Sequence, residues 1–339
     1  MTTAARSVRV DLDQARREYT PKADFNEVTR NFNYDRDRFL RHSSTRDINP
    51  HPVALSSYLT SAYHSLEKGL AMEVPRAGFG ARKIPPILAA IRELEARGHA
   101  SVATRGARGC IRAYVAYHDQ RGLALPPDLE DELREVAAEL EGEHLPGGAT
   151  RLTRQEIAEA TDFDYEKFIR TRSSVRHFTG EPVDPESLRA VVTQAIKCPK
   201  ACNRESRRVY VAYEEQLREQ VLSLHHGNRG FGHKLGAVLV ITSDLREFDM
   251  VGERNQAWID GGIFAMSLVF AFHAAGYGTC MLNWSEDCDH DQLFRSTFAI
   301  PDNEVIITLL GVGHIPDSFE VAASPAPTAD EVLSTIAPL

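Results

Sequence analysis

The residues best suited to chemistry in this chain lie in one short segment, Thr171–Phe178, which reads TRSSVRHF. Arg172 and Arg176 are four positions apart, and Ser173 and Ser174 lie between them. Guanidinium forks, hydroxyls and free backbone N–H groups are the donors that a phosphate dianion requires. The segment therefore predicts an anion site, although a charged surface turn has the same composition and remains the alternative.

Composition restricts the classes of protein to which the chain can belong. Its 339 residues are 42% hydrophobic and 26% charged, and the formal net charge is −9. A negative chain is a poor match for nucleic acid or for an anionic membrane surface, so we expect neither partner. The longest apolar stretch, Ile263–Gly276, is interrupted by His273 and is too short to span a bilayer.

The cysteines are few and scattered: Cys110, Cys198, Cys202, Cys280 and Cys288. This usage is typical of a reducing compartment rather than of a disulfide framework. The first twenty residues also lack the apolar segment of a signal peptide, so we expect a cytoplasmic protein. Cys198 and Cys202 have three residues between them and no histidine pair nearby. We interpret them as structural thiols and predict no metal site.

Helical periodicity dominates the first part of the chain. Apolar residues recur at i, i+3/i+4 and i+7 from Val53 to Leu70. Further helices, each ended by Gly or Pro, are expected at Pro86–Arg97, Ala107–Gln120 and Pro127–Leu140. The polar stretch NFNYDRDRFLRHSSTRD (31–47) is typical of an arm rather than of a core element. Residues 1–145 are therefore predicted to form a mostly helical N-terminal extension, with the boundary at Gly142–Thr153.

The second part, residues 150–339, mixes strands with helices. Strands are expected at Val209–Tyr213, Ala237–Thr242, Cys280–Trp284 and Val305–Val312. Helices are expected at Thr153–Thr171, Pro185–Lys197, Glu214–Leu224, Glu253–Ala275 and Cys288–Phe298. The helix at Glu253–Ala275 is apolar on most sides, which predicts a central or subunit-interface position. The pattern favours an α+β or α/β sandwich around one sheet.

Five segments of this part occur in an order that resembles the FMN-dependent nitroreductase family. They are TRSSVRHF, CPKACNRES (198–206), GNRGFGHKLGAVLVITSD (227–244), ERNQAWIDGGIFAMSLVFAFHAAGYGTCMLNWS (253–285) and IPDNEVIITLLGVGHIPD (300–317). The resemblance covers residues 160–339. The segment HSLEKGLAMEVPRAGFG (64–80) is similar to a branch of that family with a helical extension before the flavin domain.

The resemblance implies a fold and an activity. The fold is an α+β nitroreductase-like sandwich, with a central, mainly antiparallel sheet flanked by helices. The long helices would pair in a homodimer that holds FMN at the subunit interface. Such enzymes transfer hydride from NADH or NADPH to the flavin and then to a nitroaromatic, quinone or related small acceptor, by ping-pong kinetics. The chemistry resides on the flavin, so we expect no catalytic residue from the protein.

The resemblance also assigns roles to residues. Arg172, Ser173, Ser174 and Arg176 match the segment that binds the flavin phosphate and ribityl chain, and Asn203 matches an asparagine that hydrogen-bonds the flavin. Met281, Leu282 and Asn283 match the segment beside the isoalloxazine, although the first two could equally be strand core. Asp260, Gly261 and Gly262 match the start of the dimer helix, where we favour packing over ligation. A helix face carrying His64, with Phe79 in the following loop, is either an inter-domain face or a cap over the flavin pocket.

The chain departs from the family at several of these positions. Lys200 stands where serine is usual, and Glu205 where glutamine is usual, so a carboxylate would lie beside the reduced flavin. Ala326 and Pro327 occupy the positions of a basic pair that holds the phosphate, and losing each cation removes about 1.5–3 kcal/mol of binding. Lys200 or Arg207 would have to supply replacement charge. We therefore expect that the chain binds flavin less tightly, or in a changed geometry, than the usual member.

These departures keep a second class of function open, namely a flavin-poor nitroreductase-like protein that binds a ligand or a partner without redox turnover. A third interpretation, reductive or oxidative tailoring of a biosynthetic intermediate, shares the flavin site and differs only in the acceptor. The sequence does not choose between NADH and NADPH or identify the physiological acceptor.

Overall fold

The computed structural model describes residues 23–76, 78–138 and 146–338. The first part contains α2 (Phe25–His42), α3 (Pro52–Leu70), α4 (Ile84–Ala96), α5 (Val102–Arg121) and α6 (Glu130–Ala138). The second part adds the helices α7 (Arg154–Ala160), α8 (Tyr165–Thr171), α9 (Pro185–Ala195), α10 (Glu215–Ser223), α11 (Gln256–Ala274), α12 (Cys288–Phe298) and α13 (Ala329–Val332). Its strands are β1 (Arg207–Ala212), β2 (Ala237–Asp244), β3 (Gly278–Asn283) and β4 (Glu304–Gly313).

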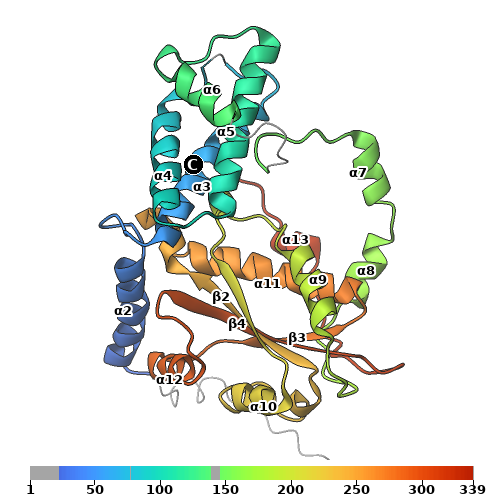
Figure 1. Cartoon of the computed structure of the whole chain (residues 1–339). Coiled ribbons are helices and arrows are strands. Elements are labelled where there is room, and N and C mark those ends of the chain that lie inside the picture. Colours follow the sequence, from blue (N-terminus) through green and yellow to red (C-terminus); the bar gives the residue numbers. More distant parts are fainter. Residues whose placement is uncertain (1–22, 77, 139–145, 339) are drawn as a thin grey trace, which may run out of the picture.

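The four strands form one antiparallel sheet in the order β1-β2-β4-β3, with helices on both faces (Figure 1). Successive strand side chains point to opposite faces, so Leu239 and Ile241 pack with α9 and α11, while Val238 and Val240 pack with α10 and α12. Both faces of β2 are buried, which explains its continuous apolar sequence. The predicted α+β sandwich with helices around a mainly antiparallel sheet is confirmed.

The long helix α11 lies against the sheet through Phe264, Leu268 and Phe272. A Cβ at Gly261 would lie 2.5 Å from Cγ1 of Ile307 in β4, so glycine is what allows this close approach. The helix is long and apolar enough to cross a membrane, yet its packing onto β2 and β4 is that of a core helix. Burial is not complete as the apolar pattern suggested, because the side chain of Ile259 on the opposite face is 52% exposed.

Helices α3 to α6 pack around a core of their own at one end of the sheet (Figure 1). Its fully buried members include Leu59, Leu66, Ile87, Ile111 and Leu133. The helices predicted over 53–70, 86–97 and 107–120 are confirmed to within a few residues, except that α5 begins five positions earlier, at Val102. The helix predicted over 127–140 begins with a 3₁₀ turn and continues as α6, and its last two positions lie outside the described residues.

The expected polar arm over residues 31–47 is wrong, because most of it belongs to α2. The inner face of α2 is held by charge as well as by apolar contact. Arg38 is buried and donates from Nη2 to the carbonyl of Asp302 (2.9 Å), and Arg30 pairs with Asp289 (2.6 Å). Phe39 adds one buried apolar contact beside Phe248. α2 is polar overall and buries only Arg38 and Phe39, so its composition favoured an arm over a core element.

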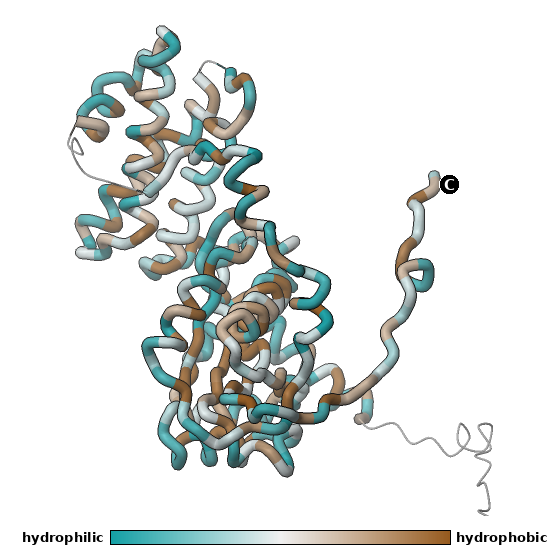
Figure 2. Tube along the Cα trace, turned by 90° about the vertical axis from the view of Figure 1, so that its right-hand side faces the viewer, coloured by the Kyte–Doolittle hydropathy of each residue, from teal (hydrophilic) through white to brown (hydrophobic). Residues whose placement is uncertain are grey.

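The single helix predicted over 153–171 is also wrong. Two short helices, α7 and α8, replace it, and Asp164 caps the second by accepting from the N–H of Lys167 (2.8 Å). They stand at the side of the sheet domain and leave Ile157 and Phe163 exposed (Figure 1). The segment after β4 likewise runs away from the domain and exposes Leu333 (Figure 2). In a single copy of the chain, these segments therefore leave apolar side chains exposed to solvent.

Candidate functional site

The Arg–Ser segment, residues 172–178, runs parallel to the edge strand β3. The N–H of Val175 donates to the carbonyl of Thr279 (2.8 Å), and Ser174 forms a bridge to the same residue. Val175 and Phe178 are buried in the core with Cys280, which fixes the backbone. The side chains of Ser174 and Arg176 are exposed, while those of Arg172 and Ser173 are partly buried.

The two guanidinium groups of this segment are not neutralised by carboxylates. Within residues 23–76, 78–138 and 146–338, neither Arg172 nor Arg176 forms an ion pair. Burial raises the pKa of the Cys280 thiol, and the nearby positive charge of Arg176 opposes that rise. Two unpaired cations beside two hydroxyls form a donor set that fits a phosphate. Because Ser174 and Arg176 are exposed, one protomer does not enclose this set.

Asn203 lies in a tight turn, η3 (Ala201–Asn203), before β1. Cys202 and Asn203 both have positive φ, 49° and 60°, a conformation that asparagine tolerates better than most residues. The N–H of Ala201 donates to Oδ2 of Asp260 (3.1 Å), a buried residue in the second turn of α11. Asp260 therefore holds the turn in place, in agreement with the packing role expected for it.

Glu205 follows this turn and is compensated by two cations. One carboxylate oxygen accepts from Nη2 of Arg207 (2.7 Å), and the other pairs with Nζ of Lys200. The Arg207 side chain is only 1% exposed, lies over the Phe264 ring and also contacts Sγ of Cys198. The expectation that Lys200 or Arg207 supplies spare charge for a phosphate is therefore wrong, because both already serve Glu205.

A cavity of about 410 Å³ separates this turn from α3 and from the loop before α5. Asn203, Glu205, Arg208, Glu247 and Tyr63 are among the residues that line it. Burial raises the pKa of Glu247 to about 7, while a hydrogen bond with Ser57 and the charge of Arg208 act in the opposite direction. The cavity therefore contains a carboxyl group that changes charge near neutral pH. The sequence pattern gave no sign of Glu247 or Arg208 as lining residues.

The three residues predicted beside the isoalloxazine lie along β3 and alternate between its faces. Leu282 is buried in the core, so its side chain is not available to a ligand. Met281 and Asn283 are exposed on the opposite face. The carbonyl of Asn283 accepts from Nε2 of His225 (3.0 Å), which fixes the end of the strand. Of the three side chains, only those of Met281 and Asn283 can contact a bound molecule.

The predicted site residues divide between two diagonally opposite corners of the sheet. Ser174 bridges to Thr279 outside β3, whereas Asn203 and Glu205 precede β1 at the other edge. The pairing register places Thr279 level with Ala237 at one end of β2, and Arg207 level with Ser243 at the other. With strands about 4.8 Å apart and a rise of about 3.3 Å per residue, the separation is roughly 25 Å. The two groups of predicted site residues therefore lie at opposite edges and opposite ends of the sheet.

Two other candidate regions lie away from both corners. Phe79 packs inside the helical layer against Tyr114 (ring centroids 5.1 Å apart) and Tyr117 (5.9 Å), so its interpretation as a cap over a flavin pocket is wrong. Ala326 and Pro327 lie in the exposed segment after β4.

Three solved structures illustrate what the chain is similar to. A protein from Desulfovibrio desulfuricans, assigned as a nitroreductase in complex with FMN, is 20% identical; the alignment covers 52% of this chain and 100% of that one (TM-score 0.45). A nitroreductase family protein from Streptococcus pneumoniae is 18% identical over 51% of this chain and all of that one (TM-score 0.43). One from Clostridium novyi is 19% identical over 46% and 87% (TM-score 0.41).

Sequence comparison gives a family match. No curated protein matches the chain. The family model described as "Nitroreductase family" matches residues 169–228 and 219–314, which include the Arg–Ser segment, the turn with Asn203 and all four strands. This part of the chain is therefore similar to the nitroreductase family.

Proposed function

We propose that this protein is an FMN-dependent oxidoreductase that transfers hydride from NADH or NADPH to a nitroaromatic, quinone or related small organic acceptor by a ping-pong mechanism. The family match supports the class of reaction. The observation that carries the proposal is the donor set of the Arg–Ser segment, in which Arg172 and Arg176 lie beside two serines with no carboxylate partner in the described chain.

In this proposal the protein binds and orients while the cofactor reacts. The chemistry that FMN supplies when bound is hydride transfer between a nicotinamide and the acceptor. Arg172 and Arg176 bind the phosphate, with Ser173 and Ser174 as additional donors. Asn203 offers an amide that donates and accepts hydrogen bonds, and Met281 and Asn283 contact the ring system. The ion pairs of Glu205 with Lys200 and Arg207 reduce its repulsion of a negatively charged ring.

We further propose a cytoplasmic homodimer in which each flavin contacts both protomers. The separation of roughly 25 Å between the two corners supports this arrangement, since a second copy can bring its Asn203 turn to the first copy's Arg–Ser segment. The uncovered apolar residues Ile259 on α11 and Ile157 on α7 are of the kind that a subunit contact buries. The cavity beside Asn203 and Glu247 is then the candidate position for the small acceptor.

The test is spectroscopic and uses the full chain. Protein purified without added flavin, and again after reconstitution with FMN, is titrated anaerobically with NADH or NADPH while the visible flavin absorbance is recorded. The proposal expects bleaching by the nicotinamide and recovery of the absorbance when a quinone or nitroaromatic is added. Sedimentation of the same samples should give a dimer. A flavin that binds but is not bleached by either nicotinamide contradicts the redox proposal.

The second candidate is a flavin-poor ligand- or partner-binding protein. It is favoured by Ala326 and Pro327, which replace two family cations, and by the engagement of Lys200 and Arg207 with Glu205. This candidate predicts that FMN binds only at concentrations far above those in a cell, and that ligands of the 410 Å³ cavity bind equally well without it. Equilibrium titration with FMN distinguishes it from the oxidoreductase.

A further inference from the structure

We infer that His226, Glu286 and His290 form a binding site for a divalent first-row transition metal ion, with Zn²⁺ as the best-matched candidate. The sequence predicts no metal site, because His226 lies 60 residues before Glu286 and farther still from His290. The inference concerns a region separate from the Arg–Ser segment and does not depend on flavin chemistry.

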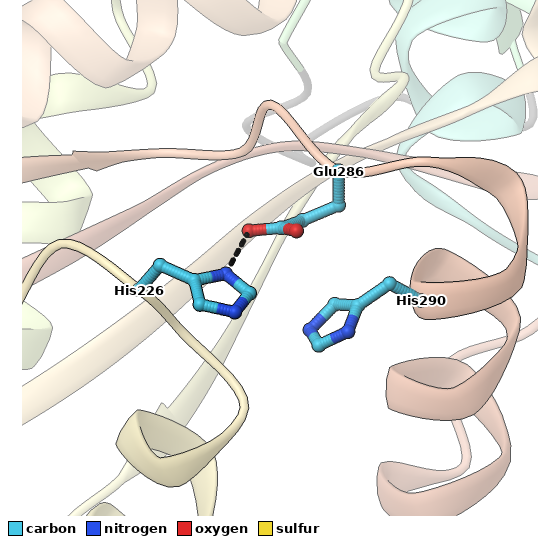
Figure 3. A group of neighbouring side chains, drawn as sticks. All are labelled: His226, Glu286 and His290. Atoms are coloured by element: carbon cyan, nitrogen blue, oxygen red, sulfur yellow. Dashed lines mark hydrogen bonds and ion pairs between the residues drawn. The ribbon is translucent and has the colours of Figure 1, made fainter. Parts of the chain in front are cut away.

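The three side chains point toward one another, with His226 on the loop after α10, Glu286 on the connection before α12 and His290 in the first turn of α12 (Figure 3). One potential ligand atom from each residue lies within 4.8 Å of the others. Nδ1 of His226 lies 3.2 Å from Oε1 of Glu286, and the two imidazole centroids are 5.4 Å apart. Zinc–nitrogen and zinc–oxygen bonds of about 2.0–2.2 Å place ligand atoms about 3–3.5 Å from one another. A small rotation of the side chains therefore suffices to surround one ion.

The backbone that carries His226 is already fixed. His225 is buried, its Nδ1 accepts from the N–H of Gly227 (3.0 Å), and its Nε2 donates to the carbonyl of Asn283 (3.0 Å). Asn228 donates to the carbonyls of Leu222 and His225, both at 2.7 Å. Because both nitrogens of His225 are used in this way, His225 supports the loop and leaves His226 as the ligand.

The opposite side of the cluster is equally well supported. Asp287 caps α12 by accepting from the N–H groups of Asp289 (3.0 Å) and His290 (2.9 Å), which fixes the backbone next to Glu286. Nε2 of His290 lies 2.8 Å from the carbonyl of Leu224. A metal bound through Nδ1 keeps this hydrogen bond, which then orients the ring as outer partners of metal-bound histidines do.

The ligand chemistry selects the class of ion. Two imidazoles and one carboxylate suit zinc and its neighbours, whereas Mg²⁺ and Ca²⁺ prefer oxygen ligands alone. Three protein ligands leave at least one coordination position, and the His226 side chain is 73% exposed, so water or a small anion completes the shell. The bound ion would join the loop after α10 to the connection between β3 and α12 and so stabilise the native state.

The experiment measures zinc binding by the tag-free full chain after chelator treatment and dialysis. Calorimetric titration should give one ion per chain and a rise in melting temperature with zinc concentration. Co²⁺ serves as the spectroscopic probe, and visible d–d bands without a thiolate charge-transfer band are expected, because no cysteine belongs to the cluster. A charge-transfer band of that kind would assign the metal to cysteines and overturn the inference.

Two substitutions test the ligands separately. His226→Ala removes an exposed side chain and Glu286→Gln retains the shape of the carboxylate, so neither should prevent folding. Each is expected to weaken zinc binding at least tenfold to a hundredfold, on the order of losses seen even for outer-shell partners. His99→Ala, an exposed histidine before α5, is the matched control and should bind zinc as the unmodified chain does. Unchanged zinc affinity in both ligand variants, or no zinc binding by the unmodified chain, would overturn the inference.

Discussion

The Arg–Ser segment and the turn that carries Asn203 and Glu205 differ in whether their cations have a carboxylate partner. At the first corner of the sheet, Arg172 and Arg176 have no carboxylate partner among the described residues. At the second, Lys200 and Arg207 both pair with Glu205, and Arg207 is almost fully buried. A cation available for a phosphate must be free of an internal partner. The first corner therefore fits the proposed phosphate site better than the second does.

The largest effect should come from removing both cations of the first corner. The variant Arg172→Ala/Arg176→Ala loses two charge-assisted contacts of about 1.5–3 kcal/mol each, so FMN affinity should fall about a hundredfold or more. Fluorescence titration with FMN measures this directly. Arg189→Ala, on the exposed face of α9, is the matched control and should bind as the unmodified chain does. Equal FMN affinity in the double variant and the control would show that the phosphate binds elsewhere.

The second corner should respond to pH through Glu247. Its folded pKa is about 7 against an ordinary value of 4.5, so the folded chain binds more protons than the unfolded chain between these values. The free energy of unfolding should therefore fall as pH rises from 4.5 to 7 and then level off, by about 2–3 kcal/mol. Urea unfolding of Glu247→Gln should lose most of this slope, whereas the exposed Glu186→Gln should keep it. A slope identical in all three chains contradicts the shifted pKa.

Substitution of Glu205 separates charge compensation from flavin binding. Glu205→Gln leaves the buried guanidinium of Arg207 without its anionic partner. Since Glu205 is half exposed, we expect a loss of only about 1–2 kcal/mol in the free energy of unfolding. FMN affinity should change less than about threefold, because the phosphate contacts lie at the other corner. The exposed Glu181→Gln is the control for stability. A large gain in FMN affinity would mean that Lys200 or Arg207, once released, binds the phosphate.

The smallest predicted effect concerns Asn203. Glycine readily adopts the φ of 60° found at Asn203, so Asn203→Gly should preserve the turn and remove only the side-chain amide. One lost hydrogen bond corresponds to a reduction in FMN affinity of about threefold to tenfold. Asn203→Ala should show the same reduction together with a stability loss of about 1 kcal/mol from backbone strain. Full FMN affinity in the glycine variant would leave the asparagine with a purely local role in the turn.

The sequence predicted the regular elements well where burial was apolar. The patterns of α3, α4 and α11 and the β-branched run of β2 follow directly from which faces are buried. The same reasoning missed α2, because this helix is polar overall and buries only Arg38 and Phe39. The apolar pattern also predicted one helix in place of α7 and α8. The break at Asp164 depends on a capping hydrogen bond rather than on hydrophobicity.

The site residues were harder to predict than the elements. The order of Arg172, Asn203 and Met281 along the chain does not reveal that the sheet runs β1-β2-β4-β3, which places Asn203 at the opposite edge from the other two. Pairing partners are equally hidden, so Lys200 and Arg207 looked free when both are engaged by Glu205. The cluster of His226 with His290 depends on the approach of the loop after α10 to the start of α12. Local pattern predicts which residue types are present, while topology decides which of them meet.

The burial of Arg38 couples α2 to the neighbouring helix α12. Its guanidinium lies 3.9 Å from Asp291, the residue that follows His290 in α12, and it donates to the carbonyl of Asp302 before β4. Proteolytic trimming, or a fusion partner that pulls α2 away, would leave a buried carboxylate with one cation fewer. Changes near the amino end of the chain should therefore affect α12. Variants made to study α12 should keep α2 intact.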